Sequence, residues 1–159
     1  MLATKVVQQL SSRGETLAFC ESLSAGLASA TIAQVPGASA VLRGGLITYT
    51  TDLKVALAHV PQELVDEYGV VSPETAVAMA KGTRWVCDAT WAVSLTGVAG
   101  PDSQEGHPVG EVFIACAGPD GVGVIRAQHS DGQELLHGDR NEIRAQAVDC
   151  ALELLLNCL

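Results

Sequence analysis

The sequence predicts a single three-layer α/β/α domain with a mixed sheet that includes an antiparallel hairpin near its carboxyl end. Helical and strand patterns alternate along the first part of the chain, which is typical of parallel strands joined by helices. Two apolar segments separated by turn residues follow later and predict the hairpin. Because 159 residues match the usual size of one domain, residues 1–159 are expected to form one unit around one core.

The first elements are predicted from hydrophobic spacing. Leu2, Val6 and Leu10 recur every fourth residue, which predicts a short helix that ends at Gly14 and packs on a sheet edge. The elements expected next are a buried strand over 16–20, a tight turn over 21–26 leading into an alanine-rich helix that ends near 35–37, a strand over 45–51 and a short helix over 52–58.

The second half begins with a strong helix signal. Ser72 offers a hydroxyl cap, Pro73 suits the first helical position and Glu74 places an acid in the first turn. The buried face of this helix is expected to carry Ala76, Met79, Ala80 and Thr83. The remaining elements expected are a strand over 90–95, a glycine-rich loop over 96–108, strands over 109–117 and 122–130, and a helix from about Asp139 that buries Ile143, Ala147, Ala151 and Leu154 or Leu155.

Composition excludes several classes of protein. Nine Lys and Arg residues against 18 Asp and Glu residues give a net charge of −9, so neither nucleic acid nor an anionic membrane surface is an expected partner. The five cysteines are scattered and form no C-x-x-C pair, which favours reduced thiols in the cytoplasm. Zinc-site motifs, dinucleotide fingerprints and phosphate-binding P-loops are absent, so the sequence predicts no metal and no cofactor.

A catalytic or anion-binding site is expected at residues 21–26, Glu-Ser-Leu-Ser-Ala-Gly, which lie between a predicted strand and a predicted helix. A helix start offers free backbone N–H groups and the positive end of the helix dipole, which suit an anion or an oxyanion. Ser22 or Ser24 is a candidate nucleophile there. The alternative is that one of these serines only caps the helix, and from this segment alone capping is the better interpretation.

A serine nucleophile needs a base that accepts its proton. Lys54, five residues after Tyr49, is one candidate, because a lysine desolvated in a pocket has a lowered pKa. A triad with one of the four histidines is a second possibility, since triads assemble in space. Taken singly, Lys54 is more simply a solvated helix residue and Tyr49 a half-buried strand residue.

Two further segments are candidate binding elements. Thr96, Gly97 and Gly100 belong to a loop that follows a buried strand, and its glycines allow close approach to a ligand, although most such loops are simple connections. Arg140 and Arg144 lie one helical turn apart near a helix start. This pair suits a phosphate, and surface pairing with neighbouring acids is an equal alternative.

The order of these segments resembles the C-terminal domain of the competence- and damage-inducible CinA family, from about residue 2 to the end. The segments that carry the resemblance are Glu21–Gly26, Val35–Gly37, Gly44–Tyr49, Lys54, Gly69–Ser72, Thr96–Asp102, Pro108–Gly110, Gly138–Arg140 and Arg144. The resemblance implies an amidohydrolase domain, in stand-alone form, that deamidates nicotinamide mononucleotide to nicotinic acid mononucleotide and ammonia without a cofactor. Self-association into a homo-oligomer is also expected.

The resemblance further implies a role for each matching residue. Ser22 is expected to be the nucleophile, Lys54 its base, and Tyr49 the residue that positions the proton path between them. Backbone N–H groups after the nucleophile are expected to bind the oxyanion. The substrate-binding residues expected in this way are Glu21, Ser24, Ala25, Gly26, Thr96, Gly97, Gly100, Arg140 and Arg144.

Three positions depart from the family pattern Glu-Ser-x-Thr-Gly-Gly and from a lysine before Pro-Val-Gly. Ser24 replaces the threonine, Ala25 replaces the first glycine and His107 replaces the lysine. The Cβ of an alanine opposes a positive φ and can crowd a pocket, and loss of the lysine removes a charge that suits a phosphate. These departures leave a second function open, in which a catalytically weak or inactive paralogue serves as a nucleotide-binding or interaction module.

Overall fold

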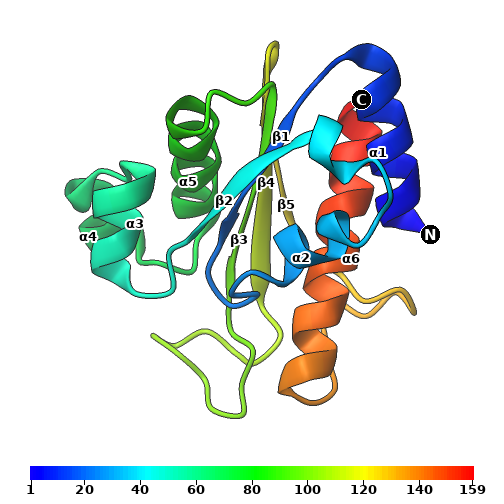
Figure 1. Cartoon of the computed structure of the whole chain (residues 1–159). Helices are drawn as coiled ribbons and strands as arrows, with labels where there is room; N and C mark the ends of the chain where they lie inside the picture. The colour runs from blue at the N-terminus through cyan, green and yellow to red at the C-terminus, as the bar shows by residue number, and fades with distance from the viewer.

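A computed structural model describes all residues, 1–159, and shows a five-stranded mixed sheet in the order β2-β1-β3-β4-β5 (Figure 1). The strands are β1 (Leu17–Glu21), β2 (Leu42–Ile47), β3 (Trp91–Gly97), β4 (Val112–Gly118) and β5 (Gly121–Arg126). Strand β1 pairs in parallel with β2 and β3, whereas β4 pairs in antiparallel fashion with β3 and with β5. The predicted mixed sheet and its late hairpin are therefore confirmed.

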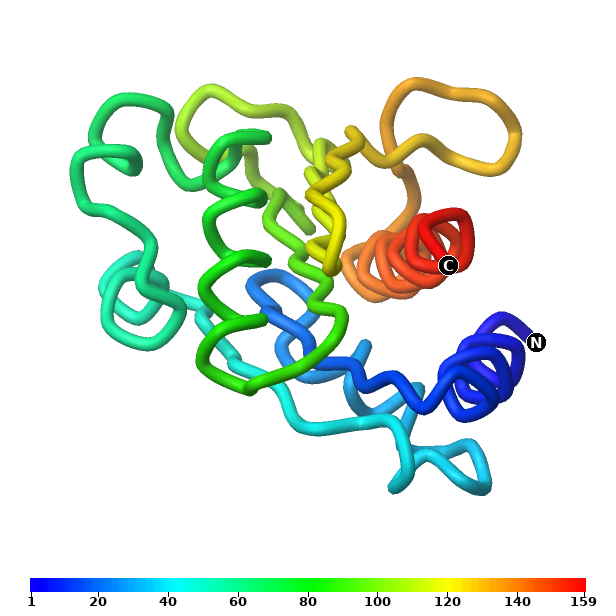
Figure 2. Tube along the Cα trace, turned by 90° about the horizontal axis from the view of Figure 1, so that it is seen from above, coloured from blue at the N-terminus to red at the C-terminus, as the bar shows by residue number.

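Helices cover both faces of this sheet. The helices are α1 (Leu2–Arg13), α2 (Leu27–Ala33), α3 (Thr51–Ala58), α4 (Gln62–Tyr68), α5 (Pro73–Val86) and α6 (Arg140–Cys158), with a short 3-10 helix over Ala38–Ala40. Seen from above, α1, α2 and α6 lie on one side of the sheet and α3, α4 and α5 on the other (Figure 2). The three-layer α/β/α class predicted from the sequence is confirmed.

The core lies on both sides of the sheet. The larger cluster joins α1, α2 and α6 to one face and includes the fully buried side chains of Phe19 and Ile114. A smaller cluster around Met79 lies under α3, α4 and α5, and a third cluster whose fully buried members are all alanines joins α5 to β4. The predicted buried face of α5 is confirmed, and in α6 the fully buried leucine at the end of the predicted stripe is Leu155, while Leu154 is only partly buried.

The predicted capping signals are present. The Ser72 hydroxyl accepts a hydrogen bond from the N–H of Thr75 at the start of α5. At the start of α6, Asp139 accepts from two backbone N–H groups while Glu142 accepts from the N–H of Asp139, which forms a capping box. Gly14 ends α1 with a φ of 64°, as the sequence predicts.

Several predicted boundaries are wrong. The second strand covers 42–47 instead of 45–51, because its register is set by parallel pairing with β1, from Leu17 opposite Leu42 to Glu21 opposite Ile47. The hairpin strands are shorter than 109–117 and 122–130. Helix α1 packs on α6 and α2 and not on a sheet edge. Helix α4, with only Val65 buried, was not predicted, because its seven residues carry little apolar periodicity.

The crossover connections create a position suited to ligand binding at one end of the sheet. From β1 the chain crosses through α2 on one face to reach β2, and from β2 it crosses through α3, α4 and α5 on the other face to reach β3. Strand β1 is therefore the switch point of the parallel part of the sheet, and in open α/β sheets ligands bind beside the carboxyl ends of strands at such a point. None of the helices combines the length and the apolar character that a membrane span requires.

Candidate active site

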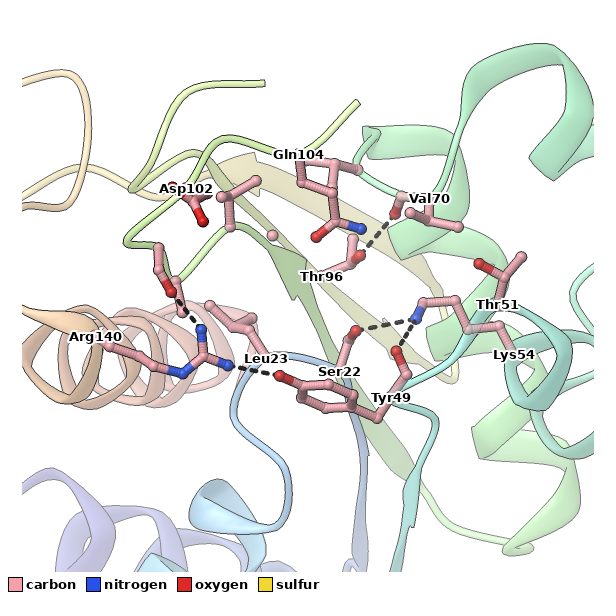
Figure 3. Close-up of a pocket in the computed structure, with 15 residues that line it drawn as sticks. Ser22, Leu23, Tyr49, Thr51, Lys54, Val70, Thr96, Asp102, Gln104 and Arg140 are labelled. Atoms are coloured by element: carbon pink, nitrogen blue, oxygen red, sulfur yellow. Dashed lines mark hydrogen bonds between the residues drawn. The ribbon is translucent and has the colours of Figure 1, made fainter. Parts of the chain in front are cut away.

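A cleft of ≈ 160 Å³ lies at the carboxyl ends of the parallel strands, beside the switch point of the sheet. Ser22 follows β1, Tyr49 follows β2, and Thr96 and Gly97 are the last residues of β3, so three neighbouring strands each contribute to the cleft. Lys54 from α3 and Arg140 from the start of α6 complete its charged lining (Figure 3). The segments that the sequence singled out separately therefore meet at one place.

Ser22 and Lys54 are in direct contact in this cleft. The Lys54 Nζ lies 3.0 Å from the Ser22 Oγ, within hydrogen-bond distance (Figure 3). Ser22 is 9% exposed and Lys54 only 2% exposed, so both groups are almost fully removed from bulk water. Lys54 is therefore not the solvated helix lysine that the sequence alone favoured, and Ser22 is not the cap of α2.

Burial lowers the pKa of Lys54 below its usual value of 10.5, because the charged form is desolvated. Charges on Cys20 and Glu105 oppose this shift. The amine also lies 2.7 Å from the Thr48 carbonyl oxygen and 3.4 Å from the Tyr49 carbonyl oxygen. A neutral amine has two N–H groups and one lone pair, and because carbonyls only accept, donation to both leaves the lone pair for the Ser22 hydroxyl proton.

The Tyr49 side chain has a different place from the one expected. Tyr49 as a whole is 51% exposed, and its hydroxyl accepts a hydrogen bond of 2.6 Å from Arg140 (Figure 3). The Tyr49 carbonyl contacts Lys54, but the phenol takes no part in the hydrogen bonds of the Ser22–Lys54 pair. Tyr49 therefore orients the amine through its backbone and holds Arg140 through its side chain.

Arg140 lies at the edge of the cleft and is only partly engaged. Its guanidinium donates to the carbonyl of Gly100 and to the Tyr49 hydroxyl. Arginine has five N–H donors, so these two contacts leave three for a ligand. Neither Arg140 nor Arg144 forms an ion pair with Asp139 or Glu142, so the surface-pairing alternative does not describe this structure.

Glu21 has a structural task in the loop that carries Ser22. Its fully buried carboxylate accepts from the N–H of Ala28 at 2.8 Å and from the N–H and hydroxyl of Ser29 at 3.1 and 2.7 Å. It thus caps α2 in place of Ser22 or Ser24, because the negative charge satisfies free N–H groups at the positive end of the helix. Glu21 does not line the cleft.

The backbone after Ser22 keeps several N–H groups free. Ala25 donates to the Ser22 carbonyl at 3.1 Å, and Leu27 donates to the Ser24 carbonyl at 3.0 Å. The N–H groups of Leu23, Ser24 and Gly26 have no acceptor within the chain, and the buried Ser24 hydroxyl also has no partner. The turn therefore offers unpaired donors directly after the serine, which is the arrangement that an oxyanion requires.

Two departures from the family pattern lie outside the cleft. Ala25 adopts a left-handed φ of 48°, is exposed to solvent and does not line the cleft, so its Cβ does not crowd the cleft. His107 pairs with Glu111 at 2.6 Å and does not line the cleft either. Gly26, with a φ of 98°, retains the glycine that this turn favours.

Arg144 is a positioning residue for the serine loop. Its Nε donates to the Leu23 carbonyl and its Nη2 to the Ser24 carbonyl, both at 2.9 Å, and its Nη1 contacts Asn141 at 3.0 Å. Arg144 does not line the cleft, so the structure separates the two arginines that the sequence treated as a pair. Arg140 faces the cleft, while Arg144 ties the loop to α6.

Replacing Arg144 with methionine is expected to lower the free energy of unfolding by about 2 kcal/mol, because half-buried charged hydrogen bonds to the loop are lost. The melting temperature should fall by roughly 4–8 °C, measured by calorimetry. Arg126→Met is the matched control, because Arg126 lies on β5 and forms only long ion pairs, with Glu111 at 3.8 Å and with the exposed Glu134 at 3.3 Å. Equal melting temperatures for the two variants would show that Arg144 does not hold the loop.

The predicted glycine loop lines the cleft, although its glycines are explained by protein neighbours. A Cβ on Gly97 would lie 2.5 Å from the Glu111 carbonyl oxygen, and one on Gly100 would lie 2.7 Å from Val109, in a backbone with a φ of 84°. Thr96 donates to the Val70 carbonyl at 2.6 Å. The loop is therefore held against the protein at the points where close approach to a ligand was expected.

Sequence reasoning missed other residues of the cleft. The unpredicted members include Thr51, Val70, Asp102 and Gln104. Asp102 and Gln104 stood in the glycine-rich segment and could have been found as polar residues after a strand, whereas Val70 offered no chemical signal. No histidine lines the cleft, so the histidine triad is not formed here, and the lining lacks the histidine and cysteine ligands of a zinc site.

Known proteins share both the sequence pattern and the fold. The family model described as CinA C-terminal domain matches residues 1–159. A competence-damage inducible protein of Listeria welshimeri is 39% identical over 159 residues, which cover 99% of this chain and 37% of that protein. A protein of the same name from Streptococcus pneumoniae is 47% identical over 125 residues, or 79% of this chain and 30% of that protein. The chain thus spans about a third of the length of these curated relatives.

Solved structures agree with the fold. The competence/damage inducible protein CihA from Agrobacterium tumefaciens superposes with a TM-score of 0.89 at 33% identity, over 98% of this chain and 92% of that one. A CinA superfamily protein from Escherichia coli gives a TM-score of 0.89 at 27% identity, covering 99% and 88%. The competence damage-inducible protein A from Klebsiella pneumoniae gives 0.91 at 26% identity, covering 98% and 93%.

Proposed function

The chain belongs to the CinA C-terminal domain family, and from this premise we propose that it hydrolyses the carboxamide of nicotinamide mononucleotide to nicotinic acid mononucleotide and ammonia. The observation that carries the proposal is the 3.0 Å contact between the Ser22 hydroxyl and the buried amine of Lys54. A serine beside a desolvated lysine is a nucleophile with its own base, and such a pair suits acyl transfer from an amide.

In the first step the neutral Lys54 amine takes the Ser22 proton as Oγ attacks the carboxamide carbon. The carbonyl oxygen becomes an oxyanion, and the free N–H groups of Leu23 and Ser24 are the proposed donors to it. The Lys54 ammonium then protonates the departing nitrogen, and ammonia leaves. Water, with its proton taken by Lys54, attacks the acyl-serine, releases the carboxylate product and restores the Ser22 hydroxyl.

The substrate is proposed to enter with its amide toward Ser22 and its phosphate toward Arg140. Lys54 is buried, whereas Arg140 is exposed and retains three unused N–H donors. The lysine therefore lies at the inner end of the cleft and the arginine at its outer end. The Tyr49 phenol and the Gly100 carbonyl hold the guanidinium between these ends. This arrangement predicts that the amide reacts fastest when a phosphate is attached.

The proposal is tested by measuring ammonia release from nicotinamide mononucleotide, nicotinamide riboside and free nicotinamide at equal concentrations. We expect release from the mononucleotide and much slower release from the two compounds that lack phosphate. Calorimetric binding of the mononucleotide without ammonia release over long incubation would support the alternative of a nucleotide-binding module. Absence of both binding and release would contradict both functions.

Replacing Arg140 with alanine is expected to raise the KM for nicotinamide mononucleotide by about 10- to 100-fold, because a charged hydrogen bond to the phosphate contributes roughly 1.5–3 kcal/mol. The KM for nicotinamide riboside should change little, since that compound has no phosphate. Steady-state kinetics on both compounds give the comparison, with Arg126→Ala as the control. An equal rise in KM for both compounds would remove Arg140 from the phosphate site.

A further inference from the structure

We propose that His129, Asp131 and His137 form a binding site for a divalent transition-metal ion, with zinc as the preferred ion, in the loop between β5 and α6. One ligand atom from each residue lies within 4.8 Å of the other two. None of the three lines the Ser22–Lys54 cleft, so the proposed ion is structural and takes no part in amide hydrolysis. The loop lies on the α6 side of the sheet, opposite α3 and α4 (Figures 1 and 2).

The three side chains converge on one carboxylate. The His129 Nδ1 lies 2.7 Å from Asp131 Oδ1, and the His137 Nε2 lies 3.1 Å from Asp131 Oδ2. The two imidazole rings have centroids 3.8 Å apart and are tilted by 36°. Each histidine nitrogen therefore contacts a different oxygen of the same carboxylate, and the three side chains surround a common space.

The His129 Nδ1 faces two groups of Asp131 at once. This nitrogen lies 3.2 Å from the N–H of Asp131 and 2.7 Å from the carboxylate of the same residue. An imidazole nitrogen has either a lone pair or a proton, so it cannot accept from the N–H and also donate to the carboxylate. When a metal ion binds, the Nδ1 lone pair and the carboxylate become its ligands, and His137 supplies a third.

The backbone holds these side chains together without any ion. A turn over 129–133 is closed by hydrogen bonds from Gly132 to His129 and from His129 to Gln133, at 2.9 and 3.1 Å. Gln133 also donates its N–H and its side-chain amide to the Asp131 carboxylate, at 3.0 and 3.3 Å. Such partners orient a carboxylate ligand in the way that outer-shell hydrogen bonds do in metal sites.

His137 is held independently from the helix side. The side-chain amide of Gln146, on α6, accepts from the His137 N–H at 3.3 Å and donates to the His137 carbonyl at 2.8 Å. The site thus joins a turn after β5 to the segment that leads into α6. His137 lies three residues before Arg140, so a bound ion would restrict the motion of the segment that leads to this arginine of the cleft.

The ligand types select the ion. Imidazole nitrogens suit zinc, copper and nickel, whereas magnesium and calcium prefer oxygen alone. Zinc–nitrogen bonds of about 2.1 Å in a tetrahedron separate ligand atoms by about 3.4 Å, so the pairs at 2.7 and 3.1 Å need to open by about 0.7 and 0.3 Å. The Asp131 and His137 side chains are 42% and 46% exposed, which leaves the fourth position to water.

The spacing of these residues is not typical of a zinc site. The pattern is His-x-Asp followed by five residues and His, which matches none of the common zinc-binding motifs. Only the turn at Gly132 and the clamp by Gln146 bring the second histidine beside the first pair. The proposal therefore depends on tertiary structure and departs from the prediction of no metal.

The test measures zinc binding to the full chain after removal of metals with a chelator. Titration calorimetry should give one zinc ion per chain at micromolar concentration, and free zinc at about 100 times the Kd should raise the melting temperature by roughly 5–10 °C. His129→Asn, Asp131→Asn and His137→Gln should each weaken binding by at least about tenfold. The control His59→Asn removes a histidine that packs against Trp85 elsewhere, and it should bind zinc as the unaltered chain does.

Cobalt provides a second measurement that separates this site from cysteine binding. The cobalt complex should show no thiolate-to-metal charge-transfer band, because none of the proposed ligands is a cysteine. The proposal is overturned if zinc does not bind, if binding persists in all three variants, or if the cobalt spectrum shows thiolate ligation. Circular dichroism checks that each variant is folded, which is expected because the altered side chains lie in a surface loop.

Discussion

The Ser22→Ala variant is expected to lower the kcat for ammonia release from nicotinamide mononucleotide by roughly 10⁴- to 10⁶-fold, the range seen when the serine of a hydrolase is removed. The reason is that no other hydroxyl lies within hydrogen-bond distance of the Lys54 amine. The chain should stay folded, because alanine fits the space of serine and Glu21 caps α2 independently.

The measurement is a coupled assay of ammonia, together with mass spectrometry of the protein after rapid quenching. An acyl adduct on the unaltered chain that is absent from Ser22→Ala would identify the covalent intermediate. Ser12→Ala is the control, because its hydroxyl only contacts the Gln9 carbonyl on α1. If Ser22→Ala retained the full rate, Ser22 would not be the nucleophile.

The Lys54→Met variant is expected to lose about 10²- to 10⁴-fold in kcat, because the general base is removed while a side chain of similar length fills its place. Methionine cannot donate to the Thr48 and Tyr49 carbonyls, so some stability is lost with these contacts. Lys81→Met is the matched control, since Lys81 is exposed on α5 and away from the Ser22–Lys54 cleft. Full activity in Lys54→Met would remove this lysine from the base role.

The pH dependence of the unaltered chain follows from the same residue. Burial lowers the pKa of Lys54 below 10.5, and the amine is an effective base only above that lowered pKa. The kcat/KM should therefore rise with pH through the lowered pKa and level off above it. Between this pKa and 10.5 the unfolded chain binds more protons than the folded one, so the free energy of unfolding also rises with pH in that window.

A flat profile of kcat/KM between about pH 6 and 9 would contradict a lysine base with a lowered pKa in that interval. Lys54→Met should abolish the dependence that belongs to Lys54 while leaving the contributions of other groups unchanged. Comparing the two profiles therefore separates the titration of the base from a general effect of pH on the fold.

Local signals in the sequence were sufficient for much of the fold. Ser72 and Pro73 predicted the start of α5, and Asp139 predicted the start of α6, because helix capping depends only on neighbouring residues. The turn between β4 and β5 was also predicted, since Gly118 and Gly121 flank a two-residue connection. Strand β2 was misplaced by several residues, because its ends are set by pairing with β1, a partner distant in the sequence.

The residues of the candidate site were also predicted only in part from the sequence. Ser22, Tyr49 and Lys54 were selected from the sequence with the help of a family resemblance, and residue chemistry alone favoured a structural role for each. The packing of α3 against the sheet buries Lys54 beside Ser22 and thereby lowers its pKa. Burial and contact across the sheet are properties of the folded chain, which spacing along the sequence does not specify.

The sequence by itself determined the class of fold, the chemical types at the ends of the strands and the family. Only the tertiary structure decided that Glu21 caps a helix, that Arg144 holds the serine loop while Arg140 faces the cleft, and that two histidines meet Asp131. The physical reason is that helix starts and turns are encoded by residues within a few positions. The partner of a charged or polar side chain, in contrast, is chosen by which distant segments pack together.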